Sequence, residues 1–335
     1  SPLTTLCYVE KDDSALMLHR VSKKHDVNKD KWIGIGGHFE EGESPEECLL
    51  REAMEETGLR LTSFRFRAIV TFIADGWPPE YMCLYTADGF EGELTDCNEG
   101  KLEWVKKAEV TKLKLWEGDK IFLKLIAEEA PFFSLKLMYQ GDVLKEAVLD
   151  GKPLELFDIC DTDGNPTGET TERSVAHTLG TIHRTAHTWV VRQSADDGFE
   201  VLLQKRSLRK DSFPGCYDIS SAGHIPAGEE YIPSAIRELK EELNVTVQES
   251  DLIYCGQVHK DVDSEFHRQP FHDHQISNVY LLWLDREAEE FELQTEEIES
   301  VRWMDYAQVR GMVASDTLPN CIIMEELDLI ERHFL

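Results

Sequence analysis

Short apolar runs alternate along the whole chain with segments in which apolar residues recur at helical spacing. Runs rich in β-branched and aromatic residues and bounded by turn residues predict strands. Strands are predicted at residues 3–9, 64–74, 80–87, 186–192, 199–204, 252–259 and 277–284, and short helices at 118–129 and 319–332. Because this alternation recurs in both halves, it predicts an α/β sandwich in each half.

One acidic pattern occurs twice, and Gly223 of the second copy stands 186 residues after Gly37 of the first. The copies run to Leu59 and Val245 with the spacing G-x5-E-x7-R-E-U-x-E-E-x-G-U, where U is apolar. Asn244, in the place of the last glycine, is the one departure. The repeat predicts two units, each with its own site.

Both copies end in a segment with two distinct helical faces. At 100° per residue, glutamates at i, i+3 and i+4 share one face of a helix. These glutamates are Glu52, Glu55 and Glu56 in the first copy and Glu238, Glu241 and Glu242 in the second. The faces expected to pack on a core carry Leu50, Ala53, Met54 and Thr57, and Ile236, Leu239 and Leu243.

The ends of these helices have local signals. Ser44, Pro45 and Glu47 form an N-cap, a first-turn proline and a capping-box glutamate, so the first helix should begin near residue 45. Gly58 suits the left-handed residue that ends it, and Asn244 can adopt the same conformation. The second helix is expected to begin near residue 233, at a proline.

Three glutamates on one helix face can be a solvated surface, but their repetition beside an arginine favours a bound cation. Like charges 4 Å apart repel by about 1 kcal/mol in water and by more near a protein surface. Carboxylate oxygens prefer Mg²⁺ or Mn²⁺, and Mg²⁺ shares its coordination positions with substrate phosphates. The pattern therefore predicts a metal ion and a phosphorylated substrate at each helix.

Length and charge restrict the organisation and the partners. A chain of 335 residues is expected to form two domains, and a polar stretch at 144–153 places the boundary near residue 148, giving 1–147 and 148–335. A formal charge of -30 argues against a nucleic-acid polymer or an acidic membrane surface as partner. A small phosphorylated molecule remains compatible, because metal ions can neutralise it locally.

Cysteine usage and hydropathy bear on location. The eight cysteines contain no C-x-x-C pair, so neither a zinc site nor a disulfide framework is indicated, and a reduced, cytoplasmic protein is expected. The longest strongly apolar run, residues 279–284, is short enough for a strand, so no membrane span is expected. The oligomeric state is left open.

The doubled pattern resembles the signature of the Nudix hydrolases. The resemblance implies two Nudix-type α/β/α sandwich domains with mixed sheets, and metal-assisted hydrolysis of a diphosphate linked to another group. It assigns metal ligation to the six glutamates, orientation of those glutamates to Arg51 and Arg237, and a carbonyl near the metal to Gly37 and Gly223. The general base among the glutamates is left unassigned.

The first half further resembles the MutT-type branch, which cleaves oxidised purine nucleoside triphosphates. The similar segments begin at Trp32, Glu80, Asp88 and Leu115. The resemblance implies that Trp32 binds substrate, Trp116 stacks on a base and Asp119 reads its edge; core packing is the alternative for Trp116. Two further base-reading positions are occupied by Gly118 and Ile33. A purine nucleoside triphosphate, possibly oxidised, is therefore expected to lose pyrophosphate here.

The second half resembles isopentenyl diphosphate isomerase and its related hydrolases through segments at 171–177, 183–189, 203–206, 213–215 and 220–224. In the isomerase, histidines matching His177, His183 and His224 help to bind a metal, although structural or surface roles are the alternative here. The catalytic cysteine is replaced by Ala222, which cannot move a proton. A hydrolase of an unidentified small diphosphate is expected; an isomerase or a nucleotide-sensing domain is the alternative.

Basic and aromatic residues surround the second copy. Lys205 and Arg206, followed by Arg209 and Lys210, could hold a non-reacting phosphate, or could be a solvated hairpin. Residues 266–274, rich in histidine and aromatics, are expected to line the pocket without forming a third metal site.

Overall fold

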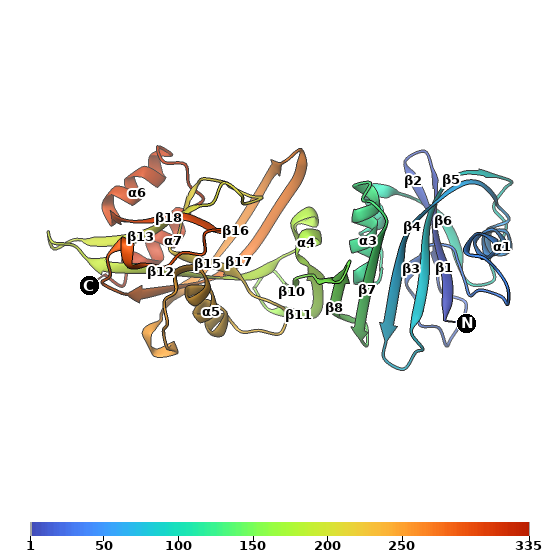
Figure 1. Cartoon of the computed structure of the whole chain (residues 1–335), viewed down its shortest axis with the longest axis horizontal. Coiled ribbons are helices and arrows are strands. Elements are labelled where there is room, and N and C mark those ends of the chain that lie inside the picture. The colour runs from blue at the N-terminus through green and yellow to red at the C-terminus, as the bar shows by residue number, and fades with distance from the viewer. Residues whose placement is uncertain (1, 335) are drawn as a thin grey trace. The chain divides into compact units, whose positions relative to one another are not determined.

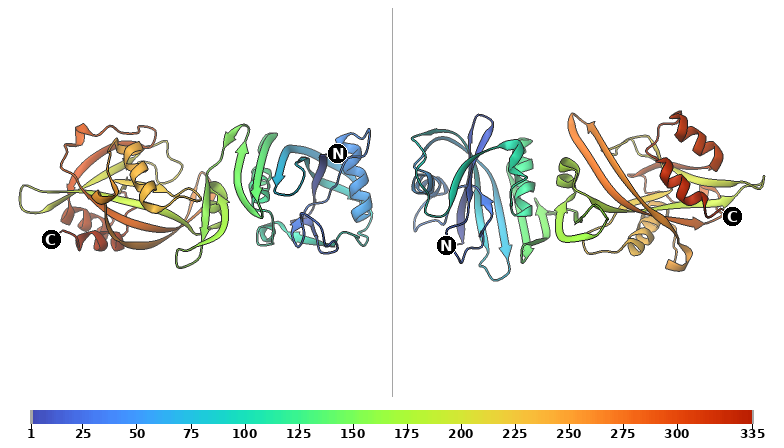
Figure 2. Two further views of the ribbon diagram at one scale, coloured as in Figure 1. Left: turned by 90° about the horizontal axis from the view of Figure 1, so that it is seen from below. Right: turned by 180° about the vertical axis from the view of Figure 1, so that it is seen from behind.

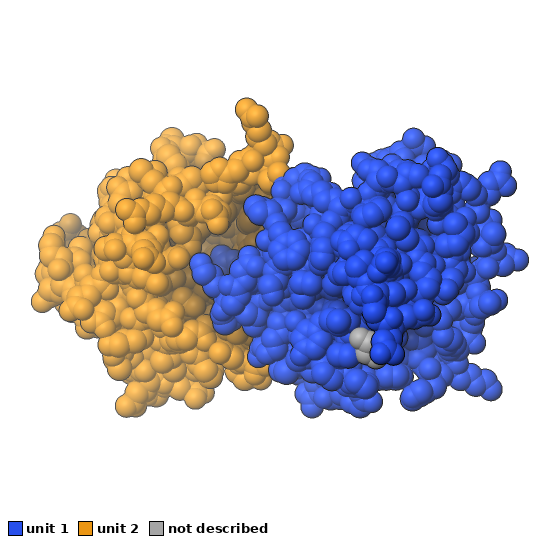
Figure 3. All heavy atoms as spheres, turned by 45° about the vertical axis from the view of Figure 1, so that its right-hand side comes forward, with its two compact units in different colours: residues 1–156, 169–175 blue, residues 157–168, 176–335 orange. Residues whose placement is uncertain are grey.

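In the computed structural model, which describes residues 2–334, the chain folds into two compact units (Figure 1, Figure 3). The first comprises residues 1–156 and 169–175, and the second comprises 157–168 and 176–335. The predicted boundary near residue 148 falls within a strand of the first unit, and the division into 1–147 and 148–335 stays a prediction. In the part of the chain that the structure describes, no helix is both long and apolar enough to span a membrane.

The first unit is built on a mixed sheet. Its elements are β1 (Leu3–Lys11), β2 (Ser14–His19), β3 (Trp32–Ile33), α1 (Pro45–Thr57), β4 (Arg60–Ala74), β5 (Glu80–Glu91), β6 (Lys101–Lys106), α2 (Lys107–Val110), α3 (Glu117–Ala127), β7 (Phe133–Gln140), β8 (Val143–Leu149) and β9 (Lys152–Pro153). The strand order is β3-β2-β1-β5-β4-β7-β8-β9, with β6 paired to β2. The pairs β1–β5 and β4–β7 are parallel and the other pairs are antiparallel.

Helices cover both faces of this sheet. Successive strand residues point to opposite faces. Cys7 of β1 packs in one cluster with Leu49 and Ala53 of α1. The neighbouring Tyr8 contacts Phe122 of α3 instead, with ring centroids 6.0 Å apart. The unit is therefore a helix–sheet–helix sandwich, with α1 and α3 on opposite sides (Figure 1).

The second unit repeats this arrangement. Its elements are β12 (His183–Gln193), β13 (Phe199–Arg206), β14 (Tyr217–Asp218), β15 (Ser221–His224), α5 (Tyr231–Leu243), η1 (Glu249–Asp251), β16 (Ile253–Phe266), β17 (Gln269–Trp283), η2 (Ala288–Glu290), β18 (Ile298–Asp305), α6 (Tyr306–Ser315) and α7 (Met324–Glu331). The order is β14-β13-β12-β17-β16, with β15 on β12 and β18 on β13; only β12–β17 is parallel. Preceding these are the hairpin β10 (Leu156–Cys160) and β11 (Pro166–Glu172), and α4 (Arg173–Leu179).

Neighbouring residues of one strand again pack against helices on opposite faces of the sheet. Val190 and Leu202 pack with Leu239 of α5, whereas Val191 and Val201 join the cluster under α6 and α7. Figure 2 shows α5 on one side of the sheet and α6 and α7 on the other. The predicted pair of α/β/α sandwiches with mixed sheets is confirmed.

The ends of the two motif helices follow the predicted signals. Ser44 caps α1, the reciprocal bond with Glu47 is present, and Pro45 is the first helical residue. Gly58 is left-handed at φ 77°, and Asn244 takes the same conformation at φ 52°. The second helix begins at Tyr231, two residues before the expected start.

The predicted core face of α1 is partly wrong. Leu50 and Met54 are 38% and 46% exposed, whereas Glu56 is only 6% exposed. The buried stripe is Leu49, Ala53, Glu56 and Thr57, because α1 packs both on the sheet and on the glycine loop that precedes it. In α5 Leu239 and Leu243 are buried as predicted, Ile236 is half-buried, and Glu242 is buried.

Replacing Asn244 tests the left-handed helix end. Asn244→Ala should lower the free energy of unfolding of the second unit by about 1 kcal/mol, because a residue with a Cβ and no local hydrogen bond is disfavoured there. Asn244→Gly should retain stability to within about 0.5 kcal/mol. Urea unfolding of the three proteins measures this, and equal losses in both variants would contradict it.

Candidate active sites

The first motif places its glutamates against a loop of glycines. The Gly36 N–H donates to Glu56 Oε2 at 3.0 Å. A Cβ on Gly37 would lie 2.4 Å from Glu52 Oε1, so only glycine permits this approach. The Gly37 carbonyl accepts a hydrogen bond from the Thr5 N–H at 2.9 Å. It also accepts a longer one from Cys48 Sγ at 3.6 Å, so a metal contact by this oxygen would replace the thiol.

Arg51 orients the acidic groups around this loop. Its Nε and Nη2 donate to the two oxygens of Glu43 at 2.6 and 2.9 Å, and Nη1 donates to Glu52 at 2.7 Å and Glu55 at 3.3 Å. Nη2 also donates to the His38 carbonyl at 3.0 Å. The bonds from Arg51 hold the pKa of Glu43 at about 2. The arginine therefore joins helix, loop and turn.

Glu56 is a buried carboxyl among other carboxylates. Burial, with a contribution from the charges of Glu99 and Glu52, raises the pKa of Glu56 to about 8, although the hydrogen bond from the Gly36 N–H opposes the shift. Glu99, on the loop before β6, is itself bonded by Arg20 and Lys23. Crowded carboxylates of this kind are suited to a divalent cation, which would supply the missing charge.

A cavity of about 470 Å³ adjoins these groups. Its lining includes residues of the motif and its glycine loop, namely Gly36, Gly37, Arg51 and Glu52. It also includes Asn28, Ile33, Phe72, Glu80, Met82, Glu99, Trp116 and Asp119. This volume is within the range of small-molecule sites. The motif glutamate Glu52 and the predicted base-binding residues Trp116 and Asp119 thus line one cavity.

Trp116 and Asp119 are both buried at this cavity. Trp116 is 4% exposed, its Nε1 donates to Asn28 Oδ1 at 2.8 Å, and Lys31 Nζ lies 4.1 Å from its ring centroid. Burial raises the pKa of Asp119 to about 8, although Lys31 opposes the shift. Trp32 is not among the described residues that line the cavity; it stacks on His19 with centroids 4.5 Å apart.

The second motif reproduces the geometry of the first. A Cβ on Gly223 would lie 2.3 Å from Glu238 Cδ. Arg237 bonds Glu229 and Glu238 and lies 3.8 Å from Glu241. Glu242 is buried and accepts from Gln204 Nε2 at 3.1 Å; its burial raises its pKa well above the ordinary value. Both predicted arginines therefore contact the glutamates of their own helix.

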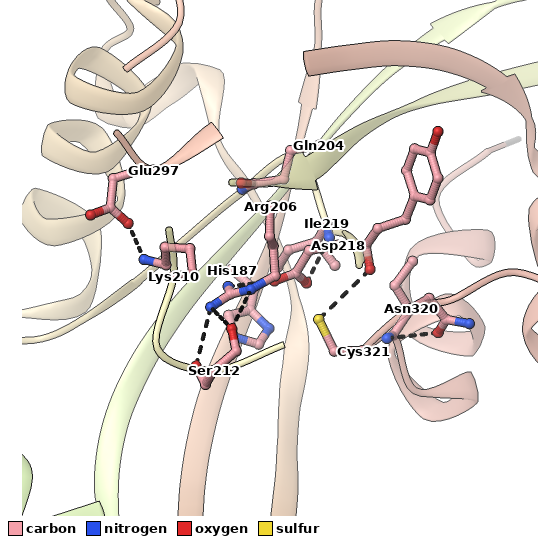
Figure 4. Close-up of polar contacts among 12 residues, drawn as sticks. His187, Gln204, Arg206, Lys210, Ser212, Asp218, Ile219, Glu297, Asn320 and Cys321 are labelled. Carbon is pink, nitrogen blue, oxygen red and sulfur yellow. Dashed lines mark hydrogen bonds and ion pairs between the residues drawn. The ribbon is translucent and has the colours of Figure 1, made fainter. Parts of the chain in front are cut away.

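The basic residues of the second unit divide into two groups. Lys205 Nζ bonds Glu299 of β18 at 3.3 Å. Arg206 donates to the Ser212 carbonyl at 3.0 Å and to Asp218 at 3.2 Å, and Lys210 bonds Glu297 (Figure 4). The charges of Asp218 and Lys210 act on Glu242. The Arg206–Lys210 segment therefore lies near the motif glutamates.

Three histidines and an aspartate form a separate cluster in the second unit. Ligand atoms of His177, His183, His224 and Asp273 all lie within 4.8 Å of one another. His183 and His224 stack on Phe157, with centroids 5.1 and 4.9 Å away. Burial would raise the pKa of Asp273, but the bond from His183 and the charges of the histidines outweigh it, so this pKa is lowered. Imidazole and carboxylate ligands suit Zn²⁺, Mn²⁺ or Fe²⁺.

Asp273 is the one residue of 266–274 that belongs to this cluster, and the expectation of no third metal site in that segment stays a prediction. This segment spans the end of the β16–β17 hairpin, and Asp273 of β17 reaches the histidines of α4, β12 and β15. The spacing of residues within this segment could not predict the cluster, because the three histidines beside Asp273 belong to other elements.

Sequence reasoning also missed a buried pair beside Ala222. His187 is opposite Ala222 in the β12–β15 register. His187 Nδ1 lies 2.8 Å from Glu326 Oε1, and Trp189 Nε1 donates to the same oxygen at 3.0 Å. Glu326 belongs to α7, far along the chain, so no local pattern could reveal this contact.

The chain is similar in sequence to several Nudix hydrolases. Nudix hydrolase 3 of Arabidopsis thaliana is 35% identical over 48% of this chain and 21% of that protein. An uncharacterized Nudix hydrolase of Clostridium acetobutylicum is 35% identical over 43% of this chain and 66% of that protein. An oxidized purine nucleoside triphosphate hydrolase of Danio rerio is 28% identical over 38% of this chain and 83% of that protein.

Among solved structures, a MutT protein from Bacillus halodurans has 30% identity and a TM-score of 0.40, covering 45% of this chain and 99% of that one. The family model of the NUDIX domain matches residues 1–126 and 182–320. These two ranges contain both glutamate helices and make up most of the chain. The chain therefore belongs to the Nudix family.

Proposed function

We propose that the chain carries two metal-dependent sites that hydrolyse phosphoanhydride bonds, one in each unit. The observation that supports this proposal is a close contact that occurs in both motifs. Gly37 lies against Glu52, and Gly223 lies against Glu238. Mg²⁺ or Mn²⁺ held by the motif glutamates would polarise phosphoryl oxygens and lower the pKa of a bound water. Arg51 and Arg237 position the glutamates in their respective sites.

In the first unit, the proposed substrate is a purine nucleoside triphosphate that loses pyrophosphate. The cavity lining combines Glu52 and Arg51 of the motif with the aromatic residues Phe72 and Trp116, and a nucleotide requires both kinds of group, for its phosphates and for its base. Trp116 supplies an aromatic wall, and Asp119 a carboxyl that keeps its proton near neutral pH. The similarity to oxidized purine nucleoside triphosphate hydrolases supports this substrate class.

In the second unit, the proposed reaction is hydrolysis of a small diphosphate. Arg206 and Lys210 are near Glu242 and could bind a phosphate that does not react. Isomerisation is disfavoured because the methyl group of Ala222 packs against the apolar core and carries no titratable proton. A purely sensing role is disfavoured because all three motif glutamates are present: Glu238 and Glu241 lie beside Arg237, and Glu242 accepts a hydrogen bond from Gln204.

We also propose a further metal site in the second unit. The His177–His183–His224–Asp273 cluster offers four ligand atoms, none of which belongs to a motif glutamate. Because His183 and Asp273 are buried, a cation there would be enclosed by protein, as in structural sites.

Isosteric variants separate the two proposed activities. Glu55→Gln should lower kcat/KM of the first site over 100-fold, since a loss of about 3 kcal/mol in transition-state stabilisation has this size. Glu241→Gln should do the same to the second site. Each variant is the control for the other, and steady-state assays measure both. Unchanged turnover of the affected substrate would reject the assignment.

Metal affinity of the first site should rise with pH. Because the pKa of Glu56 is raised to about 8, its carboxyl holds a proton below that pH, and a cation must displace it. Apparent Mg²⁺ affinity should increase by up to about tenfold per pH unit from 6 to 8 and level off above 8. Calorimetric Mg²⁺ titrations of wild type and of Glu56→Gln, each at several pH values, separate the contribution of Glu56 from that of Glu242 in the second site. The prediction is refuted if the difference in Mg²⁺ affinity between the two proteins does not change with pH.

Metal analysis of the purified chain tests the histidine cluster. Replacing His224 by Gln or Asp273 by Asn should remove one equivalent of tightly bound transition metal, because the site loses a ligand. Glu241→Gln should leave that equivalent in place. Equal metal content in all these proteins would show that the cluster binds none.

A further inference from the structure

Two polar side chains of the first cavity have no role in the proposed reaction. Asn28, on the loop between β2 and β3, and Glu80, the first residue of β5, both line the cavity beside Trp116 and Asp119. Glu80 also heads one of the segments that resemble the MutT-type branch, without an assigned role there.

The orientation of Asn28 is set by hydrogen bonds. Its Oδ1 accepts from Trp116 Nε1 at 2.8 Å, and its backbone N–H donates to Asp26 Oδ1 at 2.9 Å. The side-chain oxygen of Asn28 is thus already bonded to the Trp116 indole. No partner for Nδ2 is found among residues 2–334, so its two N–H groups are left for a ligand.

Glu80 faces the same end of the cavity from the sheet. It is opposite Phe72 in the antiparallel β4–β5 register, so both side chains lie on one face. The Phe72 ring meets the Trp116 ring edge-on, with centroids 5.1 Å apart. Burial raises the pKa of Glu80, the charge of His38 opposes this shift, and that of Asp26 adds to it. The carboxyl is therefore partly withdrawn from solvent beside the indole.

The surroundings of these two groups suit a planar ligand with a polar edge. Phe72, Met82 and Trp116 give apolar walls. The cations of the lining are paired with carboxylates: Arg20 with Asp26 and Glu99, Lys23 with Glu99, and Arg51 with Glu43 and Glu52. A phosphate beside Glu80 would be repelled by its carboxylate. Asn28 and Glu80 instead offer an amide donor and a carboxyl acceptor, which match a carbonyl next to a ring N–H.

We propose that Asn28 and Glu80 are specificity-determining residues that read a lactam edge of the base. Asn28 Nδ2 donates to the base carbonyl, and the Glu80 carboxylate accepts from the adjacent ring N–H. The ligand class is a 6-oxopurine nucleoside triphosphate, with or without oxidation of the ring. A 6-aminopurine presents an acceptor nitrogen and an amino group along the same edge and would leave both residues mismatched. This inference rests on the proposed function of the first site.

Two near-isosteric variants test the proposal. Asn28→Asp keeps the acceptor for Trp116 and replaces the amide donors by an oxygen, and Glu80→Gln replaces the acceptor by a donor at one oxygen. Glu91→Gln, at the exposed far end of β5, is the matched control. The ratio of kcat/KM for GTP and 8-oxo-GTP to that for ATP is measured on the full chain. Circular dichroism and the thermal unfolding transition of the full chain establish that each variant folds.

The ratio should fall about tenfold or more in both variants, mainly through KM, and stay unchanged in Glu91→Gln, because a mismatched polar group in a binding site is costly. An unchanged ratio in the folded Asn28 and Glu80 variants overturns this inference and leaves the proposed function standing. An equal fall in kcat for all three nucleotides also overturns it, because Glu80 would then act in the chemical step. Absence of turnover of any nucleoside triphosphate by wild type overturns the proposed function itself.

Discussion

The close approach of a helix carboxylate to a glycine backbone is the constraint on which both sites depend. At Gly37 and at Gly223 a side chain would occupy the position of a motif glutamate. The approach brings several carboxylates together, and the last glutamate of each helix is buried with a raised pKa. Arg51 and Arg237 offset part of the repulsion. The residual negative charge is what makes these places suited to a cation and a phosphate.

Around this shared frame, the two units differ in the residues that a substrate would meet. The first has a cavity whose lining includes Phe72 and Trp116 together with Asn28, Glu80 and Asp119. The second has the Arg206–Lys210 segment near Glu242, and a histidine cluster on the sheet face that also carries Ala222 and His187. One frame of glutamates and glycine with two sets of neighbours is the basis for proposing a different substrate class for each unit.

The sequence predicted the parts of the fold that depend on local chemistry. The capping box at Ser44, the left-handed Asn244 and seven strand positions follow from residue type and short-range periodicity. Helical periodicity did not predict the buried face of α1, where Glu56 rather than Met54 is buried. Glu56 is covered by the glycine loop, which lies outside the helix and donates a hydrogen bond to it.

The sites were predictable only where a motif was contiguous. The glutamates and arginines of each copy lie in one segment, and the structure brings them together as expected. Glu99, Asp273 and Glu326 reach their sites from distant elements. Their contacts depend on sheet register and helix placement, which no spacing in the sequence records.

The central claim is that one chain holds two independent sites with different substrates. Its most direct test is a panel of normal and oxidised nucleoside triphosphates, nucleotide sugars, ADP-ribose, dinucleotides and isoprenoid diphosphates. The panel is assayed with Mg²⁺ and Mn²⁺ on wild type, on each single box variant and on the double variant. The account predicts that the hydrolysed substrates divide into two sets, each lost in one single variant, and that the double variant hydrolyses none. Loss of every activity in one single variant, with none in the other, would contradict it.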